Sequence, residues 1–260
     1  MERTFSETLL SLAQKGVRFA TVFDLGCADG HFFVEHFLQG LFQEAVPVNI
    51  DANAIYENSL KQIQATFGGH YRIAAASDTA GELELTTSTH PYWSSLRPSD
   101  DLYWERVNKL TSDVQRVPAL RLDDLVAELK LAPPYLLKLD VQGAEVQALR
   151  GARGMLADTQ AVICEADIAD FQAINAELVA AGFDLYDITV LNRLADQTLG
   201  WFYPVYLNRR LAHLKPGRFW NESSNDSVVQ QQIRRRQQIL GRLANVLPQI
   251  RAAKAARKPG

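Results

Sequence analysis

The sequence predicts an α/β sandwich built around a mostly parallel sheet. Short apolar runs that can form buried strands alternate with stretches of helical periodicity along most of the chain. Several of these runs end in an acidic residue, and the carboxyl ends of parallel strands meet at one edge of a sheet, where ligands bind. We therefore expect a ligand site at that edge. The acids concerned are Asp24, Asp51, Asp78, Asp140 and Glu165.

The composition is that of one folded domain with additions. The chain has 260 residues, 47% hydrophobic and 22% charged, which is enough for one substantial core. Cys27 and Cys164 lie far apart within apolar runs, which favours buried reduced thiols over a disulfide. Neither end resembles a signal peptide, and no apolar stretch is long enough to cross a membrane, so we expect a cytoplasmic protein.

Charge is distributed unevenly along the chain. Residues 226–260 hold eight Lys or Arg and one acid, whereas the first 225 residues hold 19 basic and 29 acidic residues. An acidic core argues against a phosphate backbone as its substrate, and we expect no nucleic acid partner. We predict a domain at residues 1–217, beginning with a packing helix within residues 1–19, and a basic helical extension at residues 218–260. A heptad-like apolar stripe in this extension could pair two copies of the chain or rest on a membrane surface.

Helices are predicted where apolar residues recur at helical spacing. Gly16 suits the end of the first helix, Asp123 and Asp124 suit the start of the fourth, and Pro133 and Pro134 follow its end. The predicted helices cover residues 2–15, 31–42, 53–67, 120–131, 143–156, 171–181 and 228–250.

Strands are predicted from apolar or alternating runs. Residues 81–87 alternate in polarity, which indicates an added hairpin or edge strand. Residues 90–111 contain aromatic residues without periodicity, as lids and binding loops often do. The remaining predicted strands cover residues 22–25, 46–50, 71–76, 135–140, 161–164, 185–191 and 202–207.

The stretch TVFDLGCADG, which ends at Gly30, is the first with chemical content. Gly26 and Gly30 let the backbone turn sharply and approach a ligand, although such glycines often form only a turn. Their spacing differs from the G-x-G-x-x-G of dinucleotide sites. Asp24 and Asp29 would repel a pyrophosphate but attract a sulfonium and an ammonium group. S-adenosylmethionine therefore fits better than NAD, and Asp51 could accept hydrogen bonds from its ribose hydroxyls.

The stretch YLLKLDVQGAE, at residues 135–145, is the second. Lys138 interrupts an apolar strand and needs a buried partner. The segment LKLDVQGAE at residues 137–145, followed by LRGA at residues 149–152, resembles the K-I-D-V-E-G-A-E…L-x-G-A pattern of the FkbM-type S-adenosylmethionine-dependent methyltransferases. Further matches follow in the family's order across about residues 20–208. They are FDLG at 23–26, AASD at 75–78 followed by Gly81, SSL at 94–96 and LDDL at 122–125.

The sequence departs from this family pattern at two places. Residues 51–53 are Asp-Ala-Asn where the family more often has Glu-Pro, and Gln142 stands where Glu is commoner. Either difference could alter affinity or the surroundings of the site. The tail beyond about residue 217 matches nothing in the family pattern.

The resemblance implies a class I methyltransferase fold, a Rossmann-like sandwich with a seven-stranded sheet. It implies S-adenosylmethionine as the cofactor and methyl transfer to a hydroxyl group of a sugar, glycan or natural product. By position, it implies that Asp24, Gly26 and Gly30 hold the methionine part, Asp51 the ribose and Asp78 the adenine amino group.

Methyl transfer to a hydroxyl group needs an acceptor oxygen held in line and a base for its proton. Asp140 is the first candidate base because it ends the strand expected to face the methyl donor, with Lys138 on the same strand face. Its alternative role is a structural turn or an ion pair with Lys138. His31, directly after the glycine loop, is the second candidate. Glu145 and Ser95 are candidate substrate contacts, although Glu145 could instead cap backbone N–H groups.

Three alternatives stay open at this point. Asp140, Glu165 and Asp167 could hold a divalent metal near the acceptor, which we do not favour. The fold could bind S-adenosylmethionine without catalysis and act as a scaffold through its C-terminal helix. Less favoured is a nicotinamide-dependent oxidoreductase.

Overall fold

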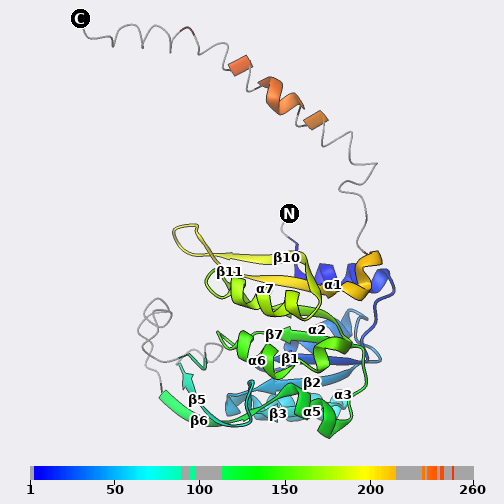
Figure 1. Ribbon diagram of the computed structural model, residues 1–260, viewed down its shortest axis with the longest axis vertical. Coiled ribbons are helices and arrows are strands. Elements are labelled where there is room, and N and C mark those ends of the chain that lie inside the picture. Colours follow the sequence, from blue (N-terminus) through cyan, green and yellow to red (C-terminus); the bar gives the residue numbers. More distant parts are fainter. Residues whose placement is uncertain are drawn as a thin grey trace, which may run out of the picture. The chain divides into compact units, whose positions relative to one another are not determined.

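The computed structural model describes residues 3–88, 94–97 and 113–214, together with residues 230–231, 233–238, 241–242 and 248. The chain divides into two units, Met1–Leu214 and Lys215–Gly260. The first unit contains the strands and most of the described helices (Figure 1). In the second, the described positions are helical and fall within the predicted helix at 228–250, whose other residues lie outside the described part.

A central, mostly parallel sheet runs through the first unit. Its strands are β1 (Thr21–Leu25), β2 (Val46–Asp51), β3 (His70–Ile73), β7 (Tyr135–Leu139), β8 (Thr159–Cys164), β9 (Ala166–Asp167), β10 (Phe183–Arg193) and β11 (Leu199–Asn208). Within the described residues their order is β10-β11-β8-β7-β1-β2-β3, with β9 pairing beside β11. The neighbours from β8 to β3 are parallel, and β11 pairs antiparallel with both β8 and β10. The predicted α/β fold with a mostly parallel sheet is confirmed, but in the described residues the sheet has eight strands rather than seven, because the short strand β9 also pairs with β11.

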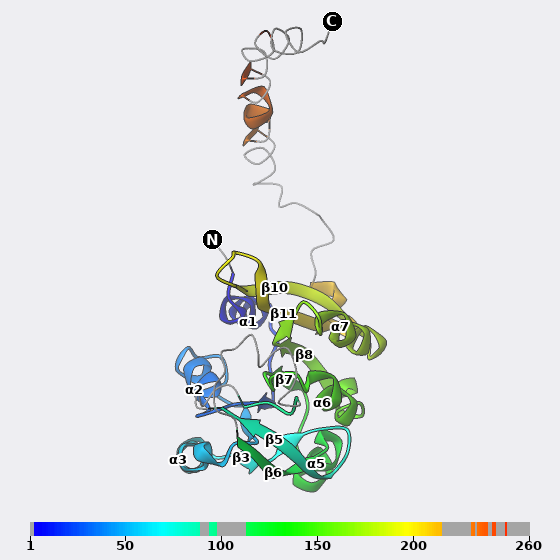
Figure 2. The same cartoon turned by 90° about the vertical axis from the view of Figure 1, so that its left-hand side faces the viewer.

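Helices cover both faces of this sheet, and its central strands are therefore buried on both sides. They are α1 (Phe5–Gln14), α2 (His31–Leu38), α3 (Glu57–Phe67), α5 (Leu122–Leu129), α6 (Glu145–Gly151) and α7 (Phe171–Ala180). Figure 2 shows α1, α2 and α3 on one side of the sheet and α5, α6 and α7 on the other.

Two cores follow from the alternation of side chains along the strands. Phe23 and Leu25 of β1 pack in the cluster that includes residues of α5, α6 and α7. Val22 of the same strand packs with residues of α1 and α2. Asp24 and Lys138 therefore point to the α2 face. Cys27 and Cys164 are both buried and free, as predicted.

A second sheet flanks the first. It has the order β4-β6-β5, formed by β4 (Ala75–Ala76), β5 (Gly81–Thr87) and β6 (Asp113–Leu120). The antiparallel register of β5 and β6 runs from Gly81 opposite Ala119 to Thr87 opposite Asp113. Strand β5 coincides with the predicted added strand. Strand β6 was not predicted: most of its residues are exposed, and only Val117 and Ala119 are buried.

Helices α2 and α6 end well before the predicted residues. Helix α2 stops at Leu38 rather than residue 42, and Gly40 follows in the left-handed region at φ 81°. Helix α6 stops at Gly151 rather than residue 156. The amides of Gly154 and Met155 instead donate to the Asp123 carboxylate, both at 2.9 Å.

Most of the predicted loop at residues 90–111 lies outside the described residues, apart from 94–97. Among the helices of the described part, none is long and apolar enough to cross a membrane.

Candidate active site

The site lies where the order of the strands in the sheet reverses. From β1 the chain proceeds through β2 to β3 on one side, and then crosses to β7 and β8 on the other. Between neighbouring strands whose connections leave in opposite directions, a crevice opens at the carboxyl ends. Here these neighbours are β1 and β7, followed by Gly26 and Asp140. A cavity of about 1280 Å³ lies at this place and is lined by both residues.

A buried ion pair joins β1 to β7 beneath the cavity. Asp24 and Lys138 are register partners, and Lys138 Nζ lies 3.0 Å from Asp24 Oδ1. Lys138 Nζ also lies 3.4 Å from Asp140 Oδ2. Burial alone would lower the pKa of Lys138, whose residue is only 6% exposed, but the charges of Asp24 and Asp140 raise it above its usual value. The lysine therefore has the buried partner that its place in an apolar strand requires.

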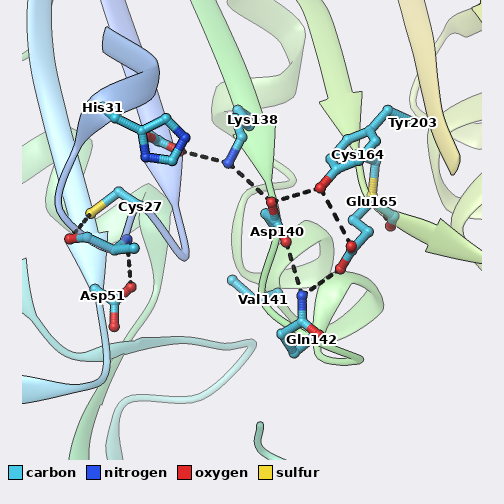
Figure 3. Close-up of polar contacts among 12 residues, drawn as sticks. Cys27, His31, Asp51, Lys138, Asp140, Val141, Gln142, Cys164, Glu165 and Tyr203 are labelled. Carbon is cyan, nitrogen blue, oxygen red and sulfur yellow. Dashed lines mark hydrogen bonds and ion pairs between the residues drawn. The ribbon is translucent and has the colours of Figure 1, made fainter. Parts of the chain in front are cut away.

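Asp140 is held by several donors (Figure 3). Besides Lys138, it accepts hydrogen bonds from Tyr203 Oη and Gln142 Nε2, each at 3.0 Å. Burial opposes ionisation, but the charge of Lys138 and the surrounding hydrogen bonds hold the pKa of Asp140 below its usual value. Asp140 is thus a carboxylate on the wall of the cavity.

Glu165 lies beside Asp140 at the end of the adjacent strand. It accepts from Gln142 Nε2 at 2.6 Å and lies 3.4 Å from Tyr203 Oη. Burial, and then the charge of Asp140, raise the pKa of Glu165 well above its usual value. Ionisation is therefore favoured at Asp140 and disfavoured at Glu165.

Asp51 is on the cavity wall at the end of β2. Its two oxygens accept from the amides of Ala28 and Asn53, both at 2.8 Å. Burial raises the pKa of Asp51 to about 6, against the effect of these hydrogen bonds. The carboxylate bridges the glycine loop and the chain after β2, and it retains lone pairs for a ligand.

Gly26 and Gly30 have different structural roles. Gly26 has φ +66°, and a Cβ there would lie 1.8 Å from the carbonyl oxygen of Asp140, so only glycine lets the loops after β1 and β7 approach this closely. Gly30 has φ +78°, and its Cβ would lie 2.4 Å from Ile63 Cδ1 of α3. Gly26 lines the cavity, whereas Gly30 is absent from its wall and packs against a helix.

His31 and Glu145 both border the cavity. The His31 side chain is 68% exposed, and its Nδ1 lies 2.8 Å from Asp29 Oδ1. Glu145 is buried and accepts from the amides of Val141 at 3.1 Å and Gly143 at 3.0 Å. Burial raises the pKa of Glu145 to about 7. Glu145 thus caps the N–H groups of the loop after β7, which is one of its two predicted roles.

Three other predicted contacts lie away from the cavity wall, as Gly30 does. Asp24 is fully buried and pairs with Lys138, so its position does not support contact with the methionine part. Asp78 is exposed, with Ser77 Oγ donating to it at 3.4 Å, and Ala74, Ala75 and Ala76 border the cavity instead.

Ser95 is the third of these contacts. Its hydroxyl group is turned to the carbonyl oxygen of Gln142, to which it donates. The neighbouring residues Ser94, Leu96 and Arg97 line the cavity in its place.

The alternative metal set does not assemble. Asp167 forms an ion pair with Arg97 at 3.6 Å and accepts from the Asp170 amide at 2.8 Å. The carboxyl groups of Asp140 and Glu165 accept hydrogen bonds from Gln142, and Asp140 also accepts one from Tyr203. Across residues 3–88, 94–97 and 113–214, no group of three His, Cys, Asp or Glu could hold a metal ion.

Sequence reasoning missed the residues on the far wall of the cavity. Tyr203 belongs to an antiparallel strand, so it was not found by the search for acids at the carboxyl ends of parallel strands. Its sequence signal is weak: a tyrosine hydroxyl group within the mostly apolar run at residues 202–207. Three partly exposed apolar residues also line this wall, namely Ile168 (59% exposed), Leu194 (43%) and Trp201 (40%). Their chain segments, between β9 and α7 and around the β10–β11 turn, come together only in the fold.

Comparison with known proteins identifies the family. Residues 24–185 match the model of the methyltransferase FkbM domain. A comparison with curated proteins found no significant match. Among solved structures, the chain is similar to the methyltransferase FkbM from Methylobacillus flagellatus KT, with a TM-score of 0.50 and 16% identity over 79% of this chain and 48% of that one. The chain thus spans about half the length of that protein.

Two further structures are similar at lower TM-scores. One is a precorrin-6y C5,15-methyltransferase from Geobacter metallireducens GS-15, with a TM-score of 0.40 and 10% identity over 76% of this chain and 83% of that one. The other is an rRNA methylase from Streptococcus thermophilus, with a TM-score of 0.40 and 11% identity over 80% of this chain and 98% of that one.

The matched region begins at Asp24 in β1 and includes the loop after β7, so it contains both strands that form the crevice. It covers more than half of the chain, and the sheet around it has the class I methyltransferase arrangement. The protein belongs to the FkbM methyltransferase family.

Proposed function

We propose that the protein is an S-adenosylmethionine-dependent O-methyltransferase acting on a hydroxyl group of a sugar, glycan or natural product. Family membership supports methyl transfer. The observation that carries transfer to oxygen is Asp140, a carboxylate on the cavity wall whose pKa is held below its usual value. A hydroxyl acceptor must lose its proton during attack, and such a carboxylate can take it.

The wall formed by β1, β2 and the chain after them fits the cofactor. Gly26 lines the cavity and lets the loops after β1 and β7 approach closely, and Asp51 retains lone pairs for ribose hydroxyls. Tyr56 and Ala76 add apolar surface suited to an adenine ring. The carboxylates on this cavity favour a cationic sulfonium over a pyrophosphate. When bound, S-adenosylmethionine supplies an electrophilic methyl group on its sulfonium.

The opposite wall fits the acceptor. Trp201, Leu194 and Ile168 offer partly exposed apolar surface against which the carbon face of an acceptor can pack. Arg97 is paired with the carboxylates of Asp167 and Asp170, so its charge is already balanced. We infer an acceptor that carries hydroxyl groups and an apolar face rather than a phosphate.

The residues of β7 lie between these two walls, where the reaction would take place. Holding the acceptor oxygen behind the methyl group supplies much of the acceleration, of order 7 to 11 kcal/mol at best. Asp140 accepts the acceptor's proton. Lys138, kept protonated by Asp24, helps keep Asp140 ionised.

Two experiments test this function. Calorimetry with S-adenosylmethionine and with NAD should show binding of the first and none of the second. Purified protein with methyl-labelled S-adenosylmethionine should then be screened by mass spectrometry against sugars, glycosides, hydroxylated natural products and RNA. Label on a hydroxyl group of one of the first three supports the proposal. Binding without transfer to any acceptor would favour a non-catalytic scaffold, and transfer to RNA alone would overturn the acceptor class.

A further inference from the structure

We propose that Tyr203 is a positioning residue for this reaction: together with Gln142 it holds the carboxyl groups of Asp140 and Glu165 in one fixed arrangement at the cavity wall. The inference rests on the proposed role of Asp140 as base. It adds two residues, from a strand and a loop that the sequence analysis did not connect.

The four side chains form a closed ring of hydrogen bonds (Figure 3). Tyr203 Oη lies 3.0 Å from Asp140 Oδ2 and 3.4 Å from Glu165 Oε1. Gln142 Nε2 lies 3.0 Å from Asp140 Oδ1 and 2.6 Å from Glu165 Oε2. The Gln142 amide donates to both acids, the Tyr203 hydroxyl lies within hydrogen-bond distance of both, and each acid uses both of its oxygens. The Asp140 carboxylate therefore has little freedom to rotate.

Both donors are themselves held in place. Strand β11 pairs Tyr203 with Thr189 of β10, and Thr189 Oγ1 donates to the Tyr203 carbonyl oxygen at 2.8 Å. The Tyr203 ring packs against Phe5 of α1, with ring centroids 5.4 Å apart. The tyrosine hydroxyl is therefore fixed by two elements outside the β1–β7 crevice.

Gln142 is fixed from the other side. It has φ +53°, and its carbonyl oxygen accepts from Ser95 Oγ. The amides on either side of it, of Val141 and Gly143, donate to Glu145. These contacts give Ser95 and Glu145 a structural place in the site, since they set the loop that aims the Gln142 amide.

This arrangement addresses an electrostatic problem. Two carboxylates at neighbouring strand ends repel each other, and a buried pair responds by keeping one proton. Lys138, which lies 3.4 Å from Asp140, and the hydrogen bonds to Asp140 favour ionisation of Asp140 over ionisation of Glu165. The tyrosine has a single O–H, and its oxygen lies closer to Asp140 than to Glu165.

The test compares Tyr203→Phe with Tyr206→Phe, the same change on the same strand. Tyr206 is buried, bonds Asn175 at 3.3 Å and does not line the cavity, so it is a matched control. Carbon-13 NMR of the carboxyl groups, with Asp140 assigned from Asp140→Asn, follows ionisation without any ligand. We expect the Asp140 titration to move up by about one pH unit in Tyr203→Phe and to stay in place in Tyr206→Phe.

Kinetics give a second readout with an acceptor found in the screen. In Tyr203→Phe the acid limb of kcat/KM should move in the same direction, and kcat should fall by roughly tenfold. Affinity for S-adenosylmethionine should stay within about twofold. If Tyr203→Phe does not fold, Gln142→Met removes the other bridging donor at similar length and should shift the titration in the same direction.

The outcomes separate this inference from the proposed function. Titration and kinetics of Tyr203→Phe equal to those of Tyr206→Phe, with turnover lost in Asp140→Asn, would overturn the role of Tyr203 and leave the function intact. A wild-type rate in Asp140→Asn would instead remove the base and with it the inference.

Discussion

At the scale of single residues, the site depends on carboxyl groups whose ionisation the fold controls. Asp140 and Glu165 lie side by side, yet their surroundings hold the pKa of Asp140 below its usual value and raise the pKa of Glu165 well above its own. Asp51 differs from both in its partners, because two backbone amides rather than side chains hold its orientation. Burial raises its pKa to about 6. The surroundings thus shift the pKa of Asp140 down and the pKa values of Glu165 and Asp51 up.

Asp51 predicts how cofactor binding depends on pH. Ribose hydroxyls donate to a carboxylate better than to a carboxylic acid, so affinity should be full above about pH 7 and fall as pH drops through about 6. Calorimetric titration of S-adenosylmethionine between pH 5 and 8 should show a loss of about tenfold. Asp51→Asn should bind weakly throughout and lose this dependence.

Asp29→Asn is the control for this experiment, because Asp29 lies near the same loop but outside the cavity wall. The affinity of Asp29→Asn for S-adenosylmethionine should depend on pH as it does in the wild-type protein. An affinity for the cofactor that stays flat over the whole range in the wild-type protein would show that Asp51 does not contact it.

At the scale of elements, the loops that follow β1 and β7 pack closely against each other, and Gly26 allows this close contact. Gly26→Ala puts a Cβ against the backbone carbonyl of Asp140, whereas Gly16→Ala meets nothing within 4 Å at a similar positive φ. Both variants should lose about 1 kcal/mol from the left-handed conformation. Gly26→Ala should lose about 2 kcal/mol more and should bind S-adenosylmethionine poorly.

Urea unfolding of the two glycine variants measures the difference. Equal losses in both would mean that the loops separate easily, and the close packing of the crevice would then have no energetic importance.

We expect the acceptor to bind against the β10–β11 hairpin, whose residues Leu194 and Trp201 line the cavity. Trp201→Ala removes a large apolar surface from the cavity wall, so KM for the acceptor should rise by roughly tenfold. Affinity for S-adenosylmethionine should not change, because the cofactor is proposed to lie on the β1–β2 side.

Ile188→Ala serves as the control for the hairpin. Ile188 is 44% exposed on β10 but does not line the cavity. If Trp201→Ala weakens cofactor binding instead of acceptor binding, the two walls are assigned the wrong way round.

At the scale of the whole molecule, the alternation of apolar and helical segments was enough to predict the central sheet. Strands such as β1 and β7 are buried on both faces, so they appear as short apolar runs, interrupted only by the paired charges of Asp24 and Lys138. Strand β6 escaped prediction because only Val117 and Ala119 are buried in it. The ends of α2 and α6 depend on Gly40 and on Asp123, whose contacts lie beyond the helix pattern itself.

The candidate site was predicted in part. Acids at the ends of parallel strands converge, and Asp51, Asp140 and Glu165 do line one cavity. A strand end does not reveal which way a side chain points, so Asp24 and Asp78 were expected on a wall that neither reaches. Tyr203 reaches the site from an antiparallel strand, whose approach to β7 depends on the fold of the whole chain.

The basic tail remains separate from this account. The basic helical extension at residues 218–260 and its pairing with a second copy or a membrane surface stay predictions. For the first unit alone, we propose that Asp140 takes the proton of a hydroxyl acceptor while the residues around it keep it ionised.

The most direct test is methyl transfer by Asp140→Asn, measured beside its affinity for S-adenosylmethionine. Asparagine keeps the shape of the side chain but cannot take a proton, so turnover should fall by about 10²-fold to 10⁴-fold. Cofactor affinity should stay within a few-fold of wild type, which would show that the site is intact. A variant that transfers methyl groups at the wild-type rate would contradict the account.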